Sequence, residues 1–226
     1  IQLSKKLGFT NMPDFENYLL QSGLQLNEVK KKLVIERTWN RFIYEAFKDT
    51  VITGEQVLIA LSQFQITLLS ANSKYDAVRQ GFDVFSEQEK KGYHLFLKHC
   101  NSCHKEPLFF ENKYENNGLK VDTFLNDFGR WNITKVSRDS LKFKTPSLRN
   151  LSYTKPYMHD GRFNTLNKVL NHYSNEVVLN NNLAPSLKKG ISLSAKDKVD
   201  LIAFLLTLND QKFILNKKHK NPNIYP

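Results

Sequence analysis

The chain contains only two cysteines, and both stand in the stretch Cys100-Asn-Ser-Cys103-His104. Cys-x-x-Cys-His is the pattern at which a c-type haem is attached covalently. Two thiols at this spacing, on a turn that joins a helix, reach both vinyl groups of one porphyrin, and the adjacent histidine then lies under the iron. The pattern predicts one haem c, with Cys100 and Cys103 as thioethers and Nε2 of His104 on the iron.

Three other uses of the cysteine pair compete with haem attachment. A thioredoxin-like redox pair follows a strand in a βαβ unit, whereas the residues before Cys100 have a helical pattern. A zinc site needs two more ligands at a suitable spacing, and the chain has no second cysteine pair. A disulfide across so short a loop would be strained. The residues alone leave these alternatives open, and we favour the haem.

The elements around the pair are predicted to be helical. Ser86 and Glu89 form a capping box for a helix over residues 86–103, and Ser194 and Asp197 form another for a helix over residues 194–208. The apolar residues of these two helices are expected to face the core: Tyr93, Phe96, Leu97, Val199, Ile202, Phe204, Leu205 and Leu208.

The rest of the chain has no internal repeat. Helical patterns also cover residues 13–20, 27–48, 54–72 and 164–174, whereas the region from Glu106 to Pro156 is long, loop-like and rich in turn residues. Such a loop is unusual in a small domain but is expected around a haem, because the porphyrin fills the core. The sequence therefore predicts an all-α fold with long loops.

Composition narrows the set of partners. The chain of 226 residues has a formal net charge of +11 and a sequence pI near 9.5. This positive net charge favours an anionic partner. No nucleic-acid-binding motif accompanies it, so we do not expect the partner to be a nucleic acid. No apolar run is long enough for a membrane span. The chain begins at Ile1 without a signal peptide, from which we expect a processed or truncated N-terminus.

Several motifs, in order along about residues 54–210, resemble the C-terminal haem domain of the bacterial di-haem cytochrome c peroxidase and MauG family. The matching stretches are GEQVLIALSQFQITLLSANSKYD, SEQEKKGYHLFLKHCNSCHKEPLF, NNGL, DFGRWNITKVSRD, PSLRN, PYMHDG and LSAKDKVDLIAFLLTLND. The resemblance implies a cytochrome c-like haem domain over residues 53–226, in which the last helix crosses the attachment helix.

The same resemblance implies a ligand for the other side of the iron. The family places it fourteen residues after the histidine of PY-x-HDG, which is His159 here, and that position is Tyr173. The tyrosine at this position resembles the MauG branch, and a phenolate stabilises ferric iron. Met158 is the rival ligand, and Tyr173 could instead be a helix residue that packs on the porphyrin.

The resemblance also assigns residues to the edge of the haem. His159 and Arg149 are implied to hold a propionate. His159 is equally compatible with a structural role in its loop, whereas an arginine such as Arg149 is more often a solvated surface charge, so its assignment rests on the family motif PSLRN. The carbonyls of Thr154 and Pro156 match positions that bind a structural calcium between two haems in relatives. Two carbonyls do not make a calcium site by themselves.

Full-length members of the family have a second haem domain, where peroxide is reduced, and this sequence has one haem motif only. Gln65 stands where peroxidases of the family often have a glutamate for acid–base chemistry. Whether the chain is an enzyme is therefore left undecided. The implied function is the electron-transfer haem domain of a peroxidase- or MauG-like oxidoreductase. It would be periplasmic and would take electrons from a small donor such as a cytochrome c or a cupredoxin, and a homodimer stays open.

Residues 1–52 do not have the pattern of a cytochrome. They resemble the N-terminal helical segment of SurA-type periplasmic chaperones, although no prolyl isomerase domain follows. The resemblance predicts a small helical segment ahead of the haem domain. It also supports an alternative function, a periplasmic chaperone-like interaction module fused to a non-catalytic cytochrome domain.

Overall fold

The computed structural model describes residues 37–49 and 51–219, and the chain divides into two compact units, Ile1–Leu69 and Ser70–Pro226. The helix predicted over residues 13–20 and most of the SurA-like segment lie outside the described residues. The domain boundary proposed at residue 53 stays a prediction.

The described part of the first unit holds two helices, α4 (Arg37–Phe47) and α5 (Gly54–Thr67). Thr53 caps α5 because its hydroxyl accepts the N–H of Gln56 while the Gln56 side chain accepts the N–H of Thr53. Ile43, Ile52 and Val57 form a small buried cluster within this unit. Helix α5 ends at Thr67, so it is shorter than the predicted helix over residues 54–72.

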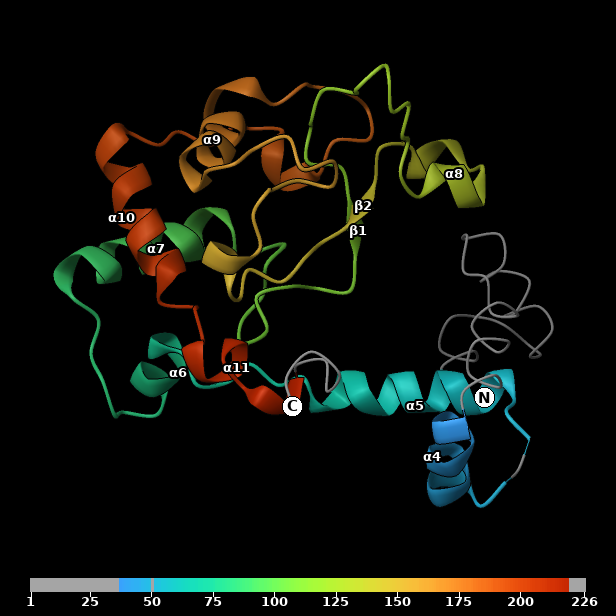
Figure 1. Ribbon diagram of the computed structural model, residues 1–226. Helices are drawn as coiled ribbons and strands as arrows, with labels where there is room; N and C mark the ends of the chain where they lie inside the picture. Colours follow the sequence, from blue (N-terminus) through green and yellow to red (C-terminus); the bar gives the residue numbers. More distant parts are fainter. Residues whose placement is uncertain (1–36, 50, 220–226) are drawn as a thin grey trace. The chain divides into compact units, whose positions relative to one another are not determined.

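The second unit is mostly helical, with one antiparallel pair of two-residue strands (Figure 1). Its helices are α6 (Lys74–Arg79), α7 (Glu87–His99), α8 (Trp131–Thr134), α9 (Leu166–Asn171), α10 (Ala195–Leu206) and α11 (Gln211–Ile214). The strands are β1 (Tyr114–Glu115) and β2 (Phe143–Lys144). Single helical turns cover Ser137–Asp139, Leu151–Tyr153, Pro185–Leu187 and Lys217–His219, and a π-helical turn, His172–Glu176, follows α9.

Both predicted capping boxes are present. The Ser86 hydroxyl accepts the N–H of Glu89 at the start of α7, and Ser194 does the same for Asp197 at the start of α10. The helices α7 and α10 cross at Gly92, where an added Cβ would lie 2.0 Å from the carbonyl oxygen of Asp200. A glycine is therefore what allows the two backbones to approach so closely.

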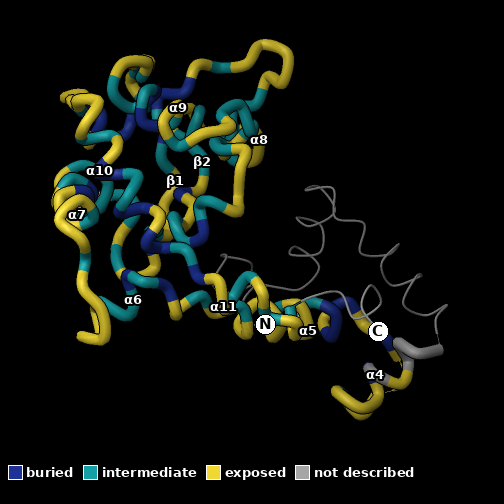
Figure 2. Tube along the Cα trace, turned by 60° about the vertical axis from the view of Figure 1, so that its left-hand side comes forward, coloured by how far each residue is buried: buried dark blue, intermediate teal, exposed yellow. Residues whose placement is uncertain are grey.

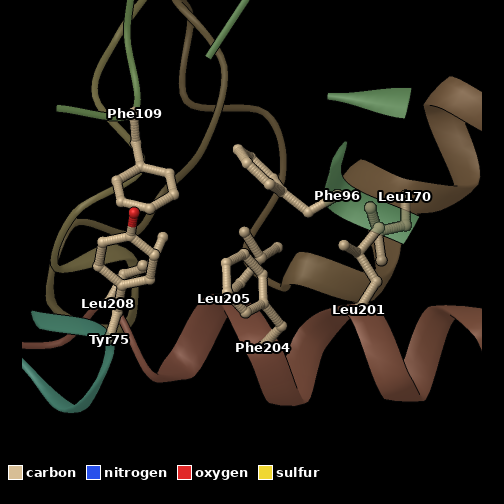
Figure 3. Close-up of a cluster of buried hydrophobic side chains, with 8 residues drawn as sticks. All are labelled: Tyr75, Phe96, Phe109, Leu170, Leu201, Phe204, Leu205 and Leu208. Carbon is tan, nitrogen blue, oxygen red and sulfur yellow. The ribbon is translucent and has the colours of Figure 1, made fainter. Parts of the chain in front are cut away.

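The core of this unit lies between α7, α10 and the loops packed against them. In Figure 3, Phe204 and Leu205 rise from α10 toward Phe96 of α7, and the ring centroids of Phe96 and Phe204 are 5.2 Å apart. The prediction that Leu97 and Val199 face the core is wrong, because these residues are 38% and 55% exposed.

The long connection from Glu106 to Pro156 is largely irregular, as predicted. Figure 2 shows buried segments alternating with exposed ones along the loops. Phe109 is fully buried, for example, whereas Leu108 beside it is 56% exposed. Segments of this connection thus reach into the core of the second unit. The prediction of an all-α fold with long loops is confirmed.

Candidate functional site

The cysteine pair lies where α7 ends. Cys100 is the C-terminal cap of α7, and its carbonyl accepts the N–H groups of Cys103 (3.1 Å) and His104 (2.9 Å). Both thiols and the imidazole therefore belong to one tight turn directly after a helix that is anchored in the core. The chain forms no bond between the two sulfurs, since both cysteines are free.

The environment of the thiols differs from that of a redox pair. Burial raises the pKa of the Cys100 thiol to about 12, and the neighbouring Cys103 adds to the rise. A reactive thiolate needs the opposite, a lowered pKa. The element before Cys100 is a helix rather than the strand of a thioredoxin-like unit. Among the described residues, no group of three or more His, Cys, Asp or Glu side chains is placed to hold a metal ion.

The hydrogen bonds of His104 fix its tautomer. Its Nδ1 atom lies 3.0 Å from the carbonyl oxygen of Pro146 and 3.3 Å from that of Phe109. Carbonyl oxygens only accept, so Nδ1 carries the proton and Nε2 keeps its lone pair. Burial lowers the pKa of His104, against the effect of these carbonyls, so the ring is neutral. A neutral imidazole with Nδ1–H bound to a carbonyl is the usual state of a histidine that ligates a metal.

Tyr173 lies in the π-helical turn after α9 and packs against a cluster of buried residues around Leu183. Burial raises the pKa of its phenol to about 12, and the thiols of Cys100 and Cys103 are among the groups that raise it further. The two thiols thus act on the pKa of this phenol although 70 residues separate Cys103 and Tyr173 in the sequence.

Met158, the rival ligand, has a left-handed backbone conformation with φ +72°. Few residues other than glycine and asparagine adopt this region, so surrounding contacts must hold Met158 there. Its sulfur accepts a hydrogen bond from the Nδ2 atom of Asn117 at 3.5 Å. The sulfur is therefore already engaged by a donor on the loop before β2.

His159 stacks on the ring of Phe143, with the ring centroids 3.6 Å apart and the planes 14° from parallel. Burial lowers its pKa, although Asp160 beside it acts in the opposite direction. The two stacked rings line a pocket together with Asn116, Asn117 and other residues of the loop that follows β1. His159 is thus oriented by stacking, and its role toward a propionate stays a prediction.

Arg149 lies in a different environment from the one that the motif suggested. Its guanidinium donates to both carboxylate oxygens of Asp76, at 2.9 and 2.8 Å, and to the carbonyl of Pro107. It also lies over the ring of Phe109, 5.5 Å from the centroid. These bonds tie the PSLRN loop, and with it the Pro146 carbonyl that holds His104, to α6. The propionate role of Arg149 stays a prediction.

Sequence reasoning missed the groups that orient the predicted ligands. The carbonyls of Pro146 and Phe109 carry no signal in the sequence, since every residue has a carbonyl. Asn117 stands in the quoted motif NNGL, but nothing in its neighbours indicates that its amide meets Met158. The hydroxyl groups of Tyr75 and Tyr93 both donate to the carboxylate of Glu106. Nothing in the sequence indicated these hydrogen bonds either.

The donor set fits a covalently attached haem. The turn offers two free thiols and a neutral imidazole whose Nε2 has no hydrogen-bond partner among the described residues. Cys100 and Cys103 would form the two thioethers and His104 would be the axial ligand. Within the described residues, no helix is long and apolar enough to cross a membrane.

Comparison with known proteins gives several matches, although no family model matches the chain. The cytochrome c peroxidase Ccp of Escherichia coli (strain K12) is 30% identical over 206 residues, which are 83% of this chain and 41% of the relative. The methylamine utilization protein MauG of Methylophilus methylotrophus is 34% identical over 172 residues, 73% of this chain and 50% of the relative.

Among solved structures, a MauG-like protein associated with microbial copper homeostasis matches with a TM-score of 0.74 and 28% identity, covering 87% of this chain and 65% of that chain. This likeness confirms the fold class predicted for the haem domain. The resemblance of residues 1–52 to SurA-type chaperones gains no support from these relatives. The chain spans about half the length of the curated relatives it matches.

Proposed function

Since the homologues of this chain are di-haem cytochrome c peroxidases and MauG proteins, we propose that it is the electron-transfer haem c domain of an oxidoreductase of that kind. Residues 53–226 form the haem domain in this proposal. The domain accepts electrons from a donor and passes them toward the site of peroxide reduction, which belongs to a second haem domain in full-length members of the family.

One observation carries the proposal. The imidazole of His104 donates from Nδ1 to the Pro146 carbonyl, so its Nε2 lone pair is available beside two free thiols on the same turn. A hydrogen bond to the second nitrogen both orients such a ring and makes it a better donor to a metal. Neither a thiol redox pair nor a structural disulfide needs this histidine.

Each residue then has a distinct role. Cys100 and Cys103 hold the porphyrin, His104 ligates the iron from one side, and the phenol of Tyr173 is the ligand that we propose for the other side. A bound haem supplies one-electron redox chemistry at its iron. Tyr173 as phenolate would favour the ferric state and lower the reduction potential relative to a methionine ligand. His159 and Arg149 are proposed to act at the haem edge, and Thr154 and Pro156 to contribute carbonyls to a calcium site.

The positive net charge of the chain favours an acidic protein as the electron donor. A net charge of +11 would speed encounter with an acidic redox protein, such as an acidic cytochrome c or cupredoxin. Attachment of haem c and the peroxidase homology both agree with a periplasmic setting. Gln65, in place of a glutamate, agrees with a domain that transfers electrons and leaves acid–base chemistry to another part of the enzyme.

The test is to produce the chain in a periplasm equipped for haem c maturation and to record its intact mass and pyridine haemochrome spectrum. We expect one haem per chain with a c-type band, and its loss in Cys100→Ala combined with Cys103→Ala. Free thiols and no added haem mass in the mature chain would refute the proposal. Hydrogen peroxide turnover with a reduced donor is expected to be near background without a second haem domain.

The distal ligand is tested by two variants of similar size change. Tyr173→Phe should alter the ferric absorption spectrum and raise the reduction potential, whereas Met158→Leu should leave both near those of the unmodified chain. If instead Met158→Leu changes the spectrum and Tyr173→Phe does not, Met158 is the distal ligand, and the proposal of a haem domain still holds.

A further inference from the structure

An open groove lies between α7 and α10, the two helices that cross at Gly92 (Figure 1). Its lining includes four basic side chains, those of Lys91, His94, Lys98 and Lys196. The three lysines are exposed, and within the described residues none of them forms an ion pair or donates a side-chain hydrogen bond. Ammonium groups on long flexible stems are therefore available at this surface to the carboxylates of a partner.

The groove also contains two carboxylates, and both are less exposed than the lysines. Asp197 accepts hydrogen bonds from the backbone N–H and the hydroxyl of Ser194, and Asp200 is only 6% exposed. A partner thus meets a positive rim around a smaller negative interior. The phosphate backbone of a nucleic acid is uniformly negative, whereas the surface of an acidic protein has charges of both signs. The mixed pattern of the groove therefore matches an acidic protein.

Two exposed apolar side chains lie beside the basic ones. Leu97 follows His94 by three positions on α7, and Val199 follows Lys196 by three positions on α10, so the members of each pair are neighbours on the surface of one helix. Leu97 is 38% exposed and Val199 is 55% exposed. Apolar contacts bordered by charged groups are the usual anatomy of a protein–protein interface.

The groove lies next to the turn of the cysteine pair. Cys100 is the C-terminal cap of α7, and Lys98 precedes it by two residues. At the rise of an α-helix, two residues are about 3 Å along the axis. A protein bound over Lys98 is therefore close to the residues that attach the haem.

We propose that this α7–α10 groove is the docking surface for an acidic protein that donates one electron at a time. The inference deepens the function proposed above and rests on it. In the docked pair, one electron passes from the metal centre of the donor to the haem of this chain. The donor is oxidised by one electron and the ferric haem is reduced to the ferrous state, without any bond being made or broken.

The test uses the haem-loaded chain and, as the probe, a small copper protein of the cupredoxin class with a net negative charge. Binding is measured by isothermal titration calorimetry, and electron transfer by stopped flow in the direction that the two midpoint potentials favour. The variant that combines Lys91→Glu, Lys98→Glu and Lys196→Glu should raise the Kd and lower the second-order rate constant by about 10-fold or more at low ionic strength. At about 1 M salt, where the Debye length is about 3 Å, the two rate constants should converge.

The matched control combines Lys212→Glu, Lys217→Glu and Lys218→Glu, which changes the net charge by the same amount. These lysines are exposed and lie on α11 and the turn Lys217–His219, beyond the end of α10 opposite to Lys196. The control should change the Kd and the rate constant by less than about 3-fold. Should the groove variant not fold, glutamine at the same three positions removes the charges without repulsion. It should still slow the reaction by about 3-fold, while the glutamine version of the control matches the unmodified chain.

Three outcomes overturn the inference. The first is an unchanged Kd and rate constant in the groove variant. The second is an equal loss in the groove variant and the control, since net charge alone would then be responsible. The third is loss of binding to phosphatidylglycerol vesicles in the groove variant with unchanged binding of the cupredoxin, which would assign the groove to a membrane surface.

Intact mass and the ferric spectrum separate these failures from failure of the proposed function. A chain that carries haem c and gives any of the three outcomes loses only the docking surface. A chain that carries no haem refutes both proposals.

Discussion

Replacing Arg149 by methionine removes an ion pair that joins two parts of the second unit that are far apart in the sequence. Arg149 and Asp76 are 73 positions apart, and their side chains are only 10% and 12% exposed. Two N–H···O bonds of 2.9 and 2.8 Å join them, and the guanidinium also donates to the carbonyl of Pro107. Methionine keeps much of the apolar stem and removes every donor.

The size of the loss in the free energy of unfolding depends on Asp76, whose charge stays buried when Arg149 is replaced. Removing one partner of a buried pair costs about 3–5 kcal/mol, because the other charge stays buried. Asp76 keeps hydrogen bonds from the backbone N–H and the hydroxyl of Ser73, so we expect a loss of about 3 kcal/mol in the free energy of unfolding for Arg149→Met. In a chain of this size that lowers the melting temperature by about 6–12 °C.

The assay is urea unfolding of the haem-loaded protein, with Asp76→Asn and the double variant completing a cycle. The asparagine side chain of Asp76→Asn retains an oxygen acceptor for the guanidinium, so this single variant should lose about 2 kcal/mol. The double variant should lose less than the sum of the two single losses by about 2 kcal/mol. Losses that add within about 0.5 kcal/mol would refute the ion pair as the source of the stabilisation.

The same pair predicts a dependence on pH. Burial acts to raise the pKa of Asp76, but hydrogen bonds from Arg149 and Ser73 outweigh it and lower the pKa below its ordinary value. The stabilisation is therefore complete above the pKa of the unfolded state, about 3.9, and is lost as the pH falls through the lower folded value. The difference between wild type and Arg149→Met should be constant near neutral pH and should shrink below about pH 4.

Four other substitutions test how the helices that carry the turn of the cysteine pair are supported. Gly92→Ala should lower the free energy of unfolding by about 2 kcal/mol in a urea titration, because the new methyl group clashes with the Asp200 carbonyl. An unchanged free energy would show that α7 and α10 can move apart at no cost. Phe96→Ala should cost about 3–5 kcal/mol and Leu97→Ala less than about 1 kcal/mol, with equal losses contradicting the burial of the two side chains. Ser194→Ala should cost about 1 kcal/mol by thermal unfolding, and an unchanged melting temperature would deny the cap a role.

Local features of the fold were predictable because their physics is local. A capping box joins residues three positions apart, so Ser86 with Glu89 and Ser194 with Asp197 could be identified from the sequence. Helical periodicity located α7 and α10 to within a few residues, apart from the extension of α7 to Cys103, which is a turn. Which residues of a helix are buried depends on its neighbour, and the predictions for Leu97 and Val199 failed for that reason.

The sequence by itself determined the chemistry of the turn, since the type and spacing of Cys100, Cys103 and His104 are sufficient to predict haem attachment. Only the tertiary structure decided how that chemistry is supported. It brought the Pro146 carbonyl to His104, Asp76 to Arg149, and the Asn117 amide to Met158. These contacts join residues 41 to 73 positions apart. Their geometry is set by how loops pack on the helix pair, and a carbonyl or an amide gives no sign in the sequence of the partner that it will meet.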